Sequence, residues 1–450
     1  MFQQKQRTEE KEMKKRAMSM VLAGVMALGF VGTLDLTTVQ AAEKTKIRVY
    51  IGGDNADLNA GLVDAFNAQS TDAEAEIVTL TDGQNGYQML TVMYNSNSAP
   101  NVFFLEEGDI KNLQDKLADV SDMECLQYAV DGATDGVTYG DKILGVPVKT
   151  QAYGLIYNKT ALANALGEDF DVTSLTSLSD FDAVCKELQE KGIAPTIISP
   201  YNWSLGNHYF TMIYGAQEDP DGFIEELKNG TADLANNAVF NEYMDTFDTL
   251  MSYNYYIDNP LEDVASEAVT QSQTLYTEQA MFWFQGSWES SVIRQLDNEN
   301  EYGFIPVPLE NTESKNYGKI CSVIPGYFCV DSACSTEEEQ QAAKEFIEFA
   351  TMSDEGQQYV IDDGNIPAYT NNDKEITESL VQSAYDYISK DESFPMYTNF
   401  AGDHYEKVGN AMQQYLDKEI DRATLAAQIE VLERKLIGVD WIIKRGCWIL

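Results

Sequence analysis

The spacing of apolar residues along the first quarter of the chain predicts alternating strands and helices. Apolar and polar side chains alternate over residues 46–51, which is typical of a half-buried strand, and the two glycines that follow mark a loop. Leu62, Val63 and Phe66 then fall at helical spacing. The same succession continues with strands predicted at 76–80 and 102–105 and helices at 86–94 and 109–117. Such alternation favours a mostly parallel, doubly wound sheet.

The rest of the chain carries further elements of both kinds. Strands are predicted at 142–148, 154–157, 302–307 and 323–330, the first two as a pair around Pro147, and residues 278–284 form an apolar segment that ends at Gly286. Helices are predicted at 178–191, 242–253, 337–350, 408–416 and 425–436. No repeat or low-complexity linker separates these elements. We therefore expect two α/β lobes that share the chain through several crossings.

Length and charge narrow the class of protein. The chain has 450 residues, more than a single hydrophobic core ordinarily organises. The formal net charge of −43 would repel a phosphate backbone, which argues against nucleic acid as a partner. A solvated surface explains the acidity most simply, and attraction of a cationic ligand is the alternative.

Cysteine and histidine are too few and too scattered for a zinc site. The six cysteines include no C-x-x-C pair, and the chain has two histidines. We expect no metal and no cofactor. A disulfide between Cys329 and either Cys334 or Cys321 is one interpretation of the spacing, and buried free thiols are the other.

Residues 1–42 have the organisation of a secretory signal peptide. A basic triplet at 14–16 precedes an apolar run at 17–34, and small residues lead to a cleavage position after Ala41 or the next residue. An uncleaved anchor is the alternative. Because no cysteine precedes Cys125, no lipid can be attached at the cleavage point, and we expect a secreted protein at the extracellular face of the cell membrane.

The last residues form an atypical tail. Residues 438–450 are apolar and basic in an otherwise acidic chain. They are interpreted either as the docked end of a helix or as a segment foreign to the protein.

Six segments, taken in order, resemble the family 1 extracellular solute-binding proteins, the group that includes maltose-binding protein. Residues 139–159 (YGDKILGVPVKTQAYGLIYNK) are similar to the family's "G-x-x-Y-G-x-P … L-x-Y-N-K" segment, and residues 278–289 (EQAMFWFQGSWE) to its "G-x-A-M … G-x-W" segment. The other four segments are 99–104, 181–195, 337–357 and 364–368. Asn101 departs from the pattern, because the family usually has aspartate there. The likeness covers about residues 43–436.

The resemblance implies a two-lobed periplasmic-binding-protein-like fold of type II, joined by a multi-strand hinge. It implies lobe 1 from 43–150 and 323–376, lobe 2 from 151–322 and 377–437, and crossings near 150–153, 321–324 and 372–380. The implied function is the substrate-binding component of an ABC importer, which closes on a sugar or oligosaccharide and delivers it to the permease subunits. Such a protein is a monomer, is not an enzyme, and meets the membrane only through the permease.

The resemblance also implies which aromatic side chains contact the sugar. Trp288 stands where the family's "G-x-W" tryptophan lines the ligand, and Trp203 lies in a loop where relatives present aromatic rings. Tyr201 and His208 are close to Trp203 in sequence, and Tyr153 lies on a crossing segment. The alternative for the two tryptophans is core packing, and for His208 a structural hydrogen bond.

Polar contacts are expected from the first lobe. Asp54 and Asn55 follow the first predicted strand, and Glu106 and Glu107 follow the third. Because the carboxyl ends of parallel strands meet at one edge of an open sheet, these loops are where a ligand is expected to bind. A turn or helix cap is the alternative for Asp54 and Asn55, and a solvated turn is the alternative for Glu106 and Glu107. The resemblance adds a late contact from Asp403 or His404.

Three other functions are weighed against sugar binding. A secreted carbohydrate-active enzyme would use Glu106 and Glu107, or Glu289, as acid and nucleophile, but no active-site motif accompanies them. A polyamine or peptide would suit acids beside aromatic rings, whereas the candidate loops contain no arginine for an anionic ligand. A purely structural surface protein is the third alternative.

Overall fold

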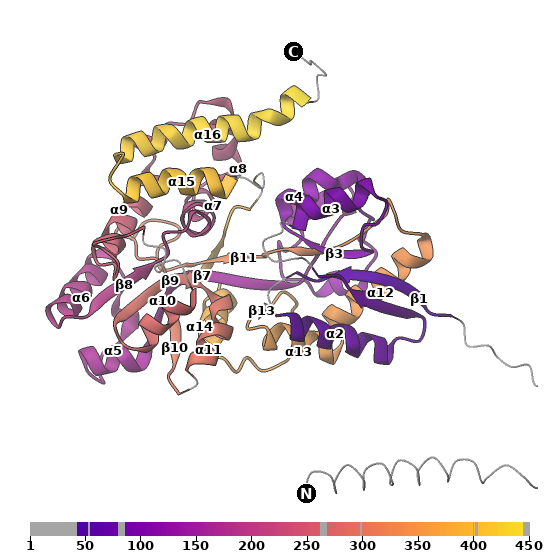
Figure 1. Cartoon of the computed structure of the whole chain (residues 1–450). Helices are drawn as coiled ribbons and strands as arrows, with labels where there is room; N and C mark the ends of the chain where they lie inside the picture. The colour runs from indigo at the N-terminus through magenta and orange to yellow at the C-terminus, as the bar shows by residue number, and fades with distance from the viewer. Residues whose placement is uncertain are drawn as a thin grey trace, which may run out of the picture. The chain divides into compact units, whose positions relative to one another are not determined.

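The computed structural model describes residues 43–52, 55–79, 86–261, 268–297, 299–398, 400 and 404–443. The predicted signal peptide and two predicted site residues, Asp54 and Asp403, lie outside these ranges. The compact unit that begins at Lys44 contains two main β-sheets (Figure 1), and each sheet has its own buried apolar clusters.

The first sheet is built around three parallel strands. In spatial order it contains β2 (Ala73–Ile77), β1 (Thr45–Tyr50), β3 (Val102–Leu105), β12 (Tyr327–Val330) and β6 (Val146–Pro147). Strand β1 is parallel to both β2 and β3, as the sequence predicts, whereas β12 and β6 add antiparallel pairs. The helices that accompany it are α2 (Ala56–Gln69), α3 (Gly86–Asn95), α4 (Glu107–Leu113), α12 (Glu337–Met352) and α13 (Asp354–Asp362). Phe66 of α2 packs edge-on against Phe346 of α12 at 5.2 Å, which joins two distant segments in one core.

The second sheet is centred on one long strand. Its order is β14 (Ser393–Pro395), β11 (Ile320–Val323), β7 (Lys149–Asn158), β9 (Ala280–Gly286) and β8 (Ala194–Ile198), and β7 also pairs with β10 (Tyr302–Ile305) and β13 (Ile366–Pro367). Every residue of β9 is buried, so helices must cover both faces of this sheet.

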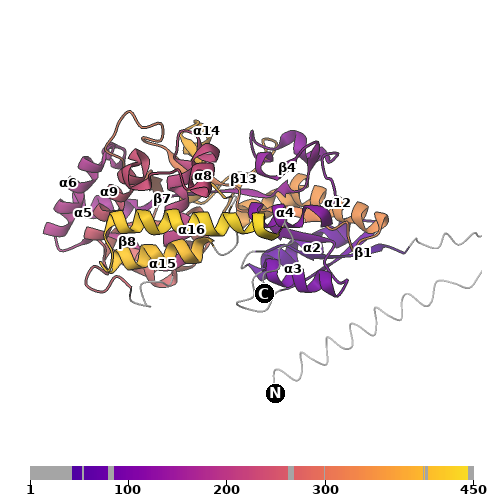
Figure 2. The same ribbon diagram turned by 90° about the horizontal axis from the view of Figure 1, so that it is seen from above.

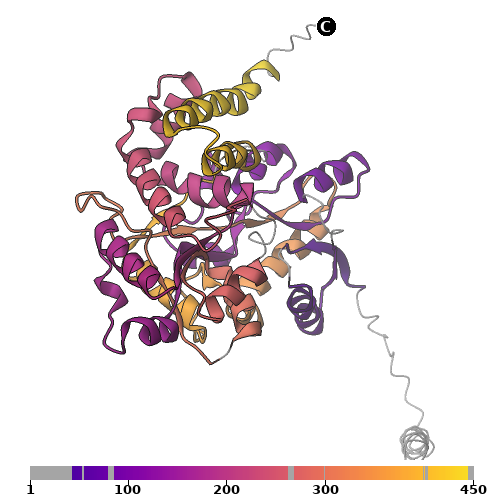
Figure 3. The ribbon, with the colours of Figure 1, turned by 60° about the vertical axis from the view of Figure 1, so that its left-hand side comes forward.

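Helices cover the second sheet from several parts of the chain. They are α5 (Lys159–Leu166), α6 (Leu178–Glu190), α7 (Phe210–Gly215), α8 (Pro220–Asn229), α9 (Ala238–Ser252), α10 (Ala268–Tyr276), α11 (Ser290–Leu296), α14 (Ser379–Ser389), α15 (His404–Leu416) and α16 (Arg422–Ile443). The last two lie side by side (Figure 2). They pack against the helices of the 204–229 region, shown in magenta next to the yellow C-terminal helices in Figure 3.

Two predicted strand arrangements are wrong. Residues 142–157 do not form a strand pair around Pro147, because β6 pairs with β12 in the first sheet while β7 belongs to the second. Residues 323–330 are likewise two strands in different sheets. Pro325 lacks a backbone N–H between them, and a side chain on Gly326 would overlap with the Phe104 ring, so the chain turns there and changes sheet.

Three segments carry the chain between the sheets. Strands β7 and β11 run antiparallel beside each other, with Tyr153 opposite Cys321, and both extend toward the first sheet in Figure 1. Strand β13 pairs with the start of β7, where Ile366 lies opposite Thr150. No helix among the described residues is long and apolar enough to cross a membrane.

The cysteines in the described part of the chain are free thiols. Cys125, Cys185, Cys321 and Cys329 are buried and Cys334 is half-buried. Burial raises the pKa of the Cys125 thiol to about 12, so this group stays protonated and unreactive at neutral pH. Of the two interpretations of the spacing, the structure has the buried free thiols. The same described residues contain no group of three or more side chains suited to hold a metal ion.

Candidate functional site

Five of the predicted ligand-contacting side chains lie together, and we call this group the aromatic cluster: Tyr153, Tyr201, Trp203, His208 and Trp288. The ring of His208 is its centre, with centroids 4.8 Å from Tyr153, 4.9 Å from Trp203 and 5.1 Å from Trp288. Tyr153 also lies 4.9 Å from Trp288, and Tyr201 lies 5.8 Å from Trp203. Residues that are far apart in sequence thus form one continuous set of rings beside the crossing strand β7.

Trp288 owes its position to the end of strand β9. A side chain at Gly286 would overlap with the six-membered ring of Trp288, so the indole can lie over the strand end only because this residue is glycine. The Trp288 Nε1–H donates to Glu289 Oε1 at 3.1 Å, which fixes the ring and leaves its face half-exposed. Trp283, five residues earlier, is fully buried instead. Core packing therefore describes Trp283, whereas Trp288 packs against the same sheet's core and stays half-buried.

Trp203 and His208 lie on a helix that the sequence does not predict. A π-helix over Ser204–Tyr209 follows Trp203 and continues into α7, so the expectation of a loop at Trp203 is wrong. π-Helical turns are rare and occur often at functional sites. This turn packs against α15 with no room for side chains, because a Cβ on Gly206 or Gly409 would overlap with the opposing backbone. Contact with α15, about 200 residues away in sequence, stabilises the π-helix.

The aromatic cluster is uncharged at neutral pH. Burial lowers the pKa of His208 to about 3, so its imidazole is neutral. Burial also raises the pKa of Tyr153 well above its usual value, with smaller contributions from Cys321 and Glu106. Nδ1 of His208 is fully buried and has no hydrogen-bond partner among the described residues, so the structural hydrogen bond expected as the alternative is not formed at this atom.

Glu106 brings an acid from the first sheet toward this cluster. It follows β3 and precedes α4, and its side chain makes no helix-capping hydrogen bond. The carboxyl group is open to solvent on one side, but the protein around it raises its pKa. It lies close enough to Tyr153 to raise the pKa of that phenol. In the next turn, burial together with Glu106 raises the pKa of Asp109 to about 7.

Glu107 points to a different place from Glu106. Its Oε2 accepts a hydrogen bond of 2.7 Å from Thr398 Oγ1, which joins α4 to the segment after β14. It lines a cavity of about 990 Å³ that also contains Thr150 and Tyr327. Because side chains alternate along a strand, Thr150 and Tyr153 project from opposite faces of β7. The cavity and the aromatic cluster therefore lie on opposite sides of this crossing strand.

The remaining predicted polar residues have structural contacts. Asn55 is exposed and its side chain accepts from the Leu58 N–H at 3.2 Å, which is the helix-cap alternative. His404 is buried, with its Nε2 2.5 Å from Glu433 Oε1 and its ring stacked on Phe400 at 4.0 Å. Neither residue belongs to the aromatic cluster.

Gln151 is a polar neighbour of the cluster that the sequence analysis did not single out. It lies two residues before Tyr153 on β7 and so shares its face of the strand. Its Nε2 donates to Asn365 Oδ1 at 2.7 Å, in a fully buried contact between two crossing segments. Its place two residues before Tyr153, on the same predicted crossing segment, is the signal that could have indicated it.

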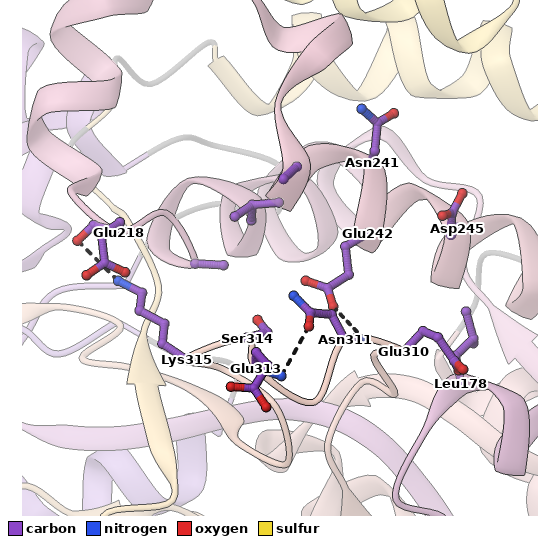
Figure 4. A pocket seen from close by; sticks show the side chains of 13 residues that line it. Leu178, Glu218, Asn241, Glu242, Asp245, Glu310, Asn311, Glu313, Ser314 and Lys315 are labelled. Atoms are coloured by element: carbon purple, nitrogen blue, oxygen red, sulfur yellow. Dashed lines mark hydrogen bonds between the residues drawn. The ribbon is translucent and has the colours of Figure 1, made fainter.

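A second hollow of about 500 Å³ (Figure 4) is lined by residues of helix α9 and of the segment 310–315, and no residue of the aromatic cluster lines it. It is lined by acidic side chains and contains no aromatic ring. Three of its five carboxylates are engaged by neighbours: Glu242 accepts from the Asn311 N–H, Glu310 accepts from Ser179, and Asp245 pairs with Arg422. These contacts describe a solvated, internally bonded surface.

Comparison with solved structures establishes the fold. SBP RafE in complex with raffinose, a protein whose apo form comes from Streptococcus pneumoniae, superposes with a TM-score of 0.70 and 14% identity, covering 87% of this chain and 100% of that chain. A sugar transporter from Bacillus licheniformis in complex with stachyose superposes with a TM-score of 0.66 and 16% identity, covering 87% of this chain and 100% of that chain. The cyclic alpha-maltosyl-1,6-maltose binding protein from Arthrobacter globiformis superposes with a TM-score of 0.66 and 17% identity, covering 88% of this chain and 99% of that chain. The predicted two-lobed α/β binding-protein fold is therefore confirmed.

Sequence comparison establishes the family. No curated protein sequence matches the chain closely enough to count as a relative. The sequence pattern of the bacterial extracellular solute-binding proteins, however, matches residues 61–380. Members of this family bind solutes and are not enzymes, so the prediction of a non-catalytic protein is confirmed by the match. Because the match extends over more than half of the sequence, the chain belongs to the family of bacterial extracellular solute-binding proteins.

Proposed function

We propose that this protein captures an uncharged sugar or oligosaccharide between its two lobes and delivers it to the permease subunits of an ABC importer. The observation that carries the proposal is the aromatic cluster beside the crossing strand, with Trp288 and Trp203 both half-buried. The C–H faces of a sugar ring pack well on a flat aromatic surface, and its hydroxyl groups need polar partners. Glu106, Tyr153 and His208 supply such partners.

The charge of the cluster favours a neutral solute over a cation. A polyamine would need several ionised acids around the rings, whereas of the described acids beside the cluster Glu106 has a pKa that desolvation raises, and Glu289 is buried and accepts a hydrogen bond from the Trp288 Nε1–H. The similar structures point the same way, since they include complexes with raffinose and with stachyose, and a chitin oligosaccharide binding protein. A polyamine or peptide remains the rival solute for the binding experiment.

The proposal includes the layout of the mature protein. Residues 1–42 form a cleaved leader, lobe 1 comprises 43–150 and 323–376, and lobe 2 comprises 151–322 and 377–437. The mature chain acts as a monomer at the extracellular face of the membrane, which it contacts through the permease. Mass spectrometry of the exported protein tests the leader: a mature N-terminus after Ala41 or Ala42 is expected, and a retained leader contradicts it.

Thermal shift and calorimetry test the solute. Raffinose, stachyose, a chitin oligosaccharide and spermidine are compared, because a ligand that binds the native state raises the melting temperature. We expect a sugar to stabilise the protein equally at low and high salt, since a neutral ligand is not screened. Stabilisation by spermidine alone, lost as salt is added, would favour the rival solute and refute the sugar.

Trp288→Ala tests the site itself. Loss of the stacking surface is expected to weaken sugar binding by about 2 kcal/mol, from the apolar area no longer covered. Tyr276→Ala is the matched control, because Tyr276 is 41% exposed on α10 and outside the aromatic cluster. Equal affinities of the two variants would remove Trp288 from the site.

A further inference from the structure

We infer that His208 is held in the tautomer with its proton on Nδ1, and that its Nε2 accepts a hydrogen bond from a hydroxyl group of the bound solute. The inference rests on the proposed function and deepens it, because it names the atom that recognises a hydroxyl and the direction of the hydrogen bond. It is carried by the surroundings of the two ring nitrogens, which differ.

Nδ1 is enclosed by groups that do not hydrogen bond with it. The atom is fully buried and has no partner among the described residues. The rings recorded around His208 are those of Tyr153, Trp203 and Trp288. A buried polar atom without a partner is costly, so its protonation state is expected to be the one that these rings tolerate.

Aromatic neighbours tolerate an N–H better than a lone pair. The face of an aromatic ring carries negative charge and its edge positive charge. The imidazole forms T-shaped pairs with Trp203 and Trp288, at interplanar angles of 66° and 64°, and a tilted pair with Tyr153 at 57°, so in the first two pairs an edge of one ring meets a face of the other. An N–H directed at such a face is weakly attracted, whereas a nitrogen lone pair is repelled. The geometry therefore favours the proton on Nδ1.

Nε2 is then an acceptor that no described side chain occupies. A neutral imidazole carries one N–H donor and one acceptor nitrogen. His208 keeps 8% of its surface exposed, and no hydrogen bond of its Nε2 occurs within the described residues. Tyrosine hydroxyl groups can accept or donate, but a neutral imidazole with its proton on Nδ1 can only accept at Nε2. The solute group at this position must therefore be a donor, and a sugar hydroxyl group fits it.

The tautomer can be measured without any ligand. The chain has two histidines, so a sample labelled with ¹⁵N-histidine gives signals from His208 and His404 alone, and His208→Phe assigns them. We expect Nδ1 of His208 to have the shift of a protonated nitrogen and Nε2 that of an unprotonated one. A proton found on Nε2 overturns the inference.

Binding experiments test the role of Nε2, with raffinose as the probe. His208→Phe keeps an aromatic ring between Trp203 and Trp288 and removes the acceptor. We expect unchanged or higher thermal stability, because the buried unpaired nitrogen is lost, and an affinity for raffinose about tenfold weaker. His208→Gln keeps an acceptor oxygen at about the same reach and should recover part of the affinity.

Monodeoxy derivatives of raffinose identify the hydroxyl group. One derivative should bind the wild-type protein about tenfold more weakly, while His208→Phe binds that derivative and raffinose equally. Equal loss on every derivative in both proteins contradicts the role of Nε2. If raffinose does not bind the wild-type protein at all, that sugar assignment fails, and the tautomer measurement alone decides the state of His208.

Discussion

Gly286→Ala should abolish the stacking surface of Trp288 without altering any group that contacts the solute. The new Cβ would lie 1.8 to 2.3 Å from three carbons of the Trp288 ring, whereas non-bonded carbons need about 3.5 Å between them. The backbone at this position, with φ −106° and ψ 167°, accommodates alanine, so the indole and not the strand must move. Because Trp288 is half-exposed, its ring can swing outward at a modest cost in folding stability.

The expected loss of affinity follows from the area of the stacking contact. A sugar ring that covers about 80 Å² of indole surface gains about 2 kcal/mol at about 25 cal/mol per Å², which corresponds to about thirtyfold in Kd. Calorimetry against the sugar with the largest thermal shift measures this change. Gly61→Ala is the matched control, because a Cβ there meets nothing within 4 Å and alanine favours helix α2.

Two results would refute this reasoning. Wild-type affinity in Gly286→Ala would mean that the ring keeps its place or does not stack on the solute. A further thirtyfold loss on adding Trp288→Ala to Gly286→Ala would mean that the first substitution had left the stacking contact intact, since two changes that remove one contact should not add.

Three further predictions concern contacts outside the aromatic cluster. Gly108→Ala should weaken solute binding with little effect on the melting temperature of the free protein. The reason is that a Cβ at this position overlaps with the Phe400 carbonyl and separates α4 from the segment after β14. An unchanged affinity in calorimetry would contradict this prediction. The pKa of Asp109 is raised to about 7, so the native state retains a proton that the unfolded chain releases near pH 4, and stability falls as pH rises between those values. Asp109→Asn should reduce the difference in melting temperature between pH 5 and pH 8, and an unchanged difference would contradict the raised pKa of Asp109. Glu433→Ala should lower the free energy of unfolding, measured with urea, by about 3 kcal/mol, because it leaves buried groups of His404 and Tyr214 without their hydrogen-bond partner. A decrease below about 1 kcal/mol would contradict these hydrogen bonds.

Local patterns in the sequence were sufficient to predict helices with capping residues at their ends and strands that pair with neighbours close in sequence. The start of α12 is an example, because Thr336 and Glu339 form the reciprocal capping contacts that their spacing indicates. Strands β1 to β3 alternate with helices and pair in parallel as expected. The changes of sheet after Pro147 and at Gly326 could not be predicted, because which strand pairs with a short apolar segment depends on residues far away in the chain.

In the candidate site, too, features set by local sequence could be predicted and features set by distant contacts could not. The "G-x-W" spacing indicated Trp288, and the crossing segment indicated Tyr153, because both patterns are continuous in sequence. The divergence of Glu106 and Glu107 could not be predicted, since it follows from the first turn of α4 and from a hydrogen bond to Thr398. The π-helix was missed because no local signal distinguishes it from a loop.

The packing of the π-helix on α15 has a consequence for the point at which an exported chain becomes able to bind. Trp203 and His208 precede Gly409, the residue whose backbone supports their helix, by about 200 residues. A chain without residues 404–416 lacks this support, and we expect its solute affinity to be low. Under the proposed export, the binding surface would then form only after the C-terminal helices have reached the outside of the cell, so a partly exported chain would not retain solute.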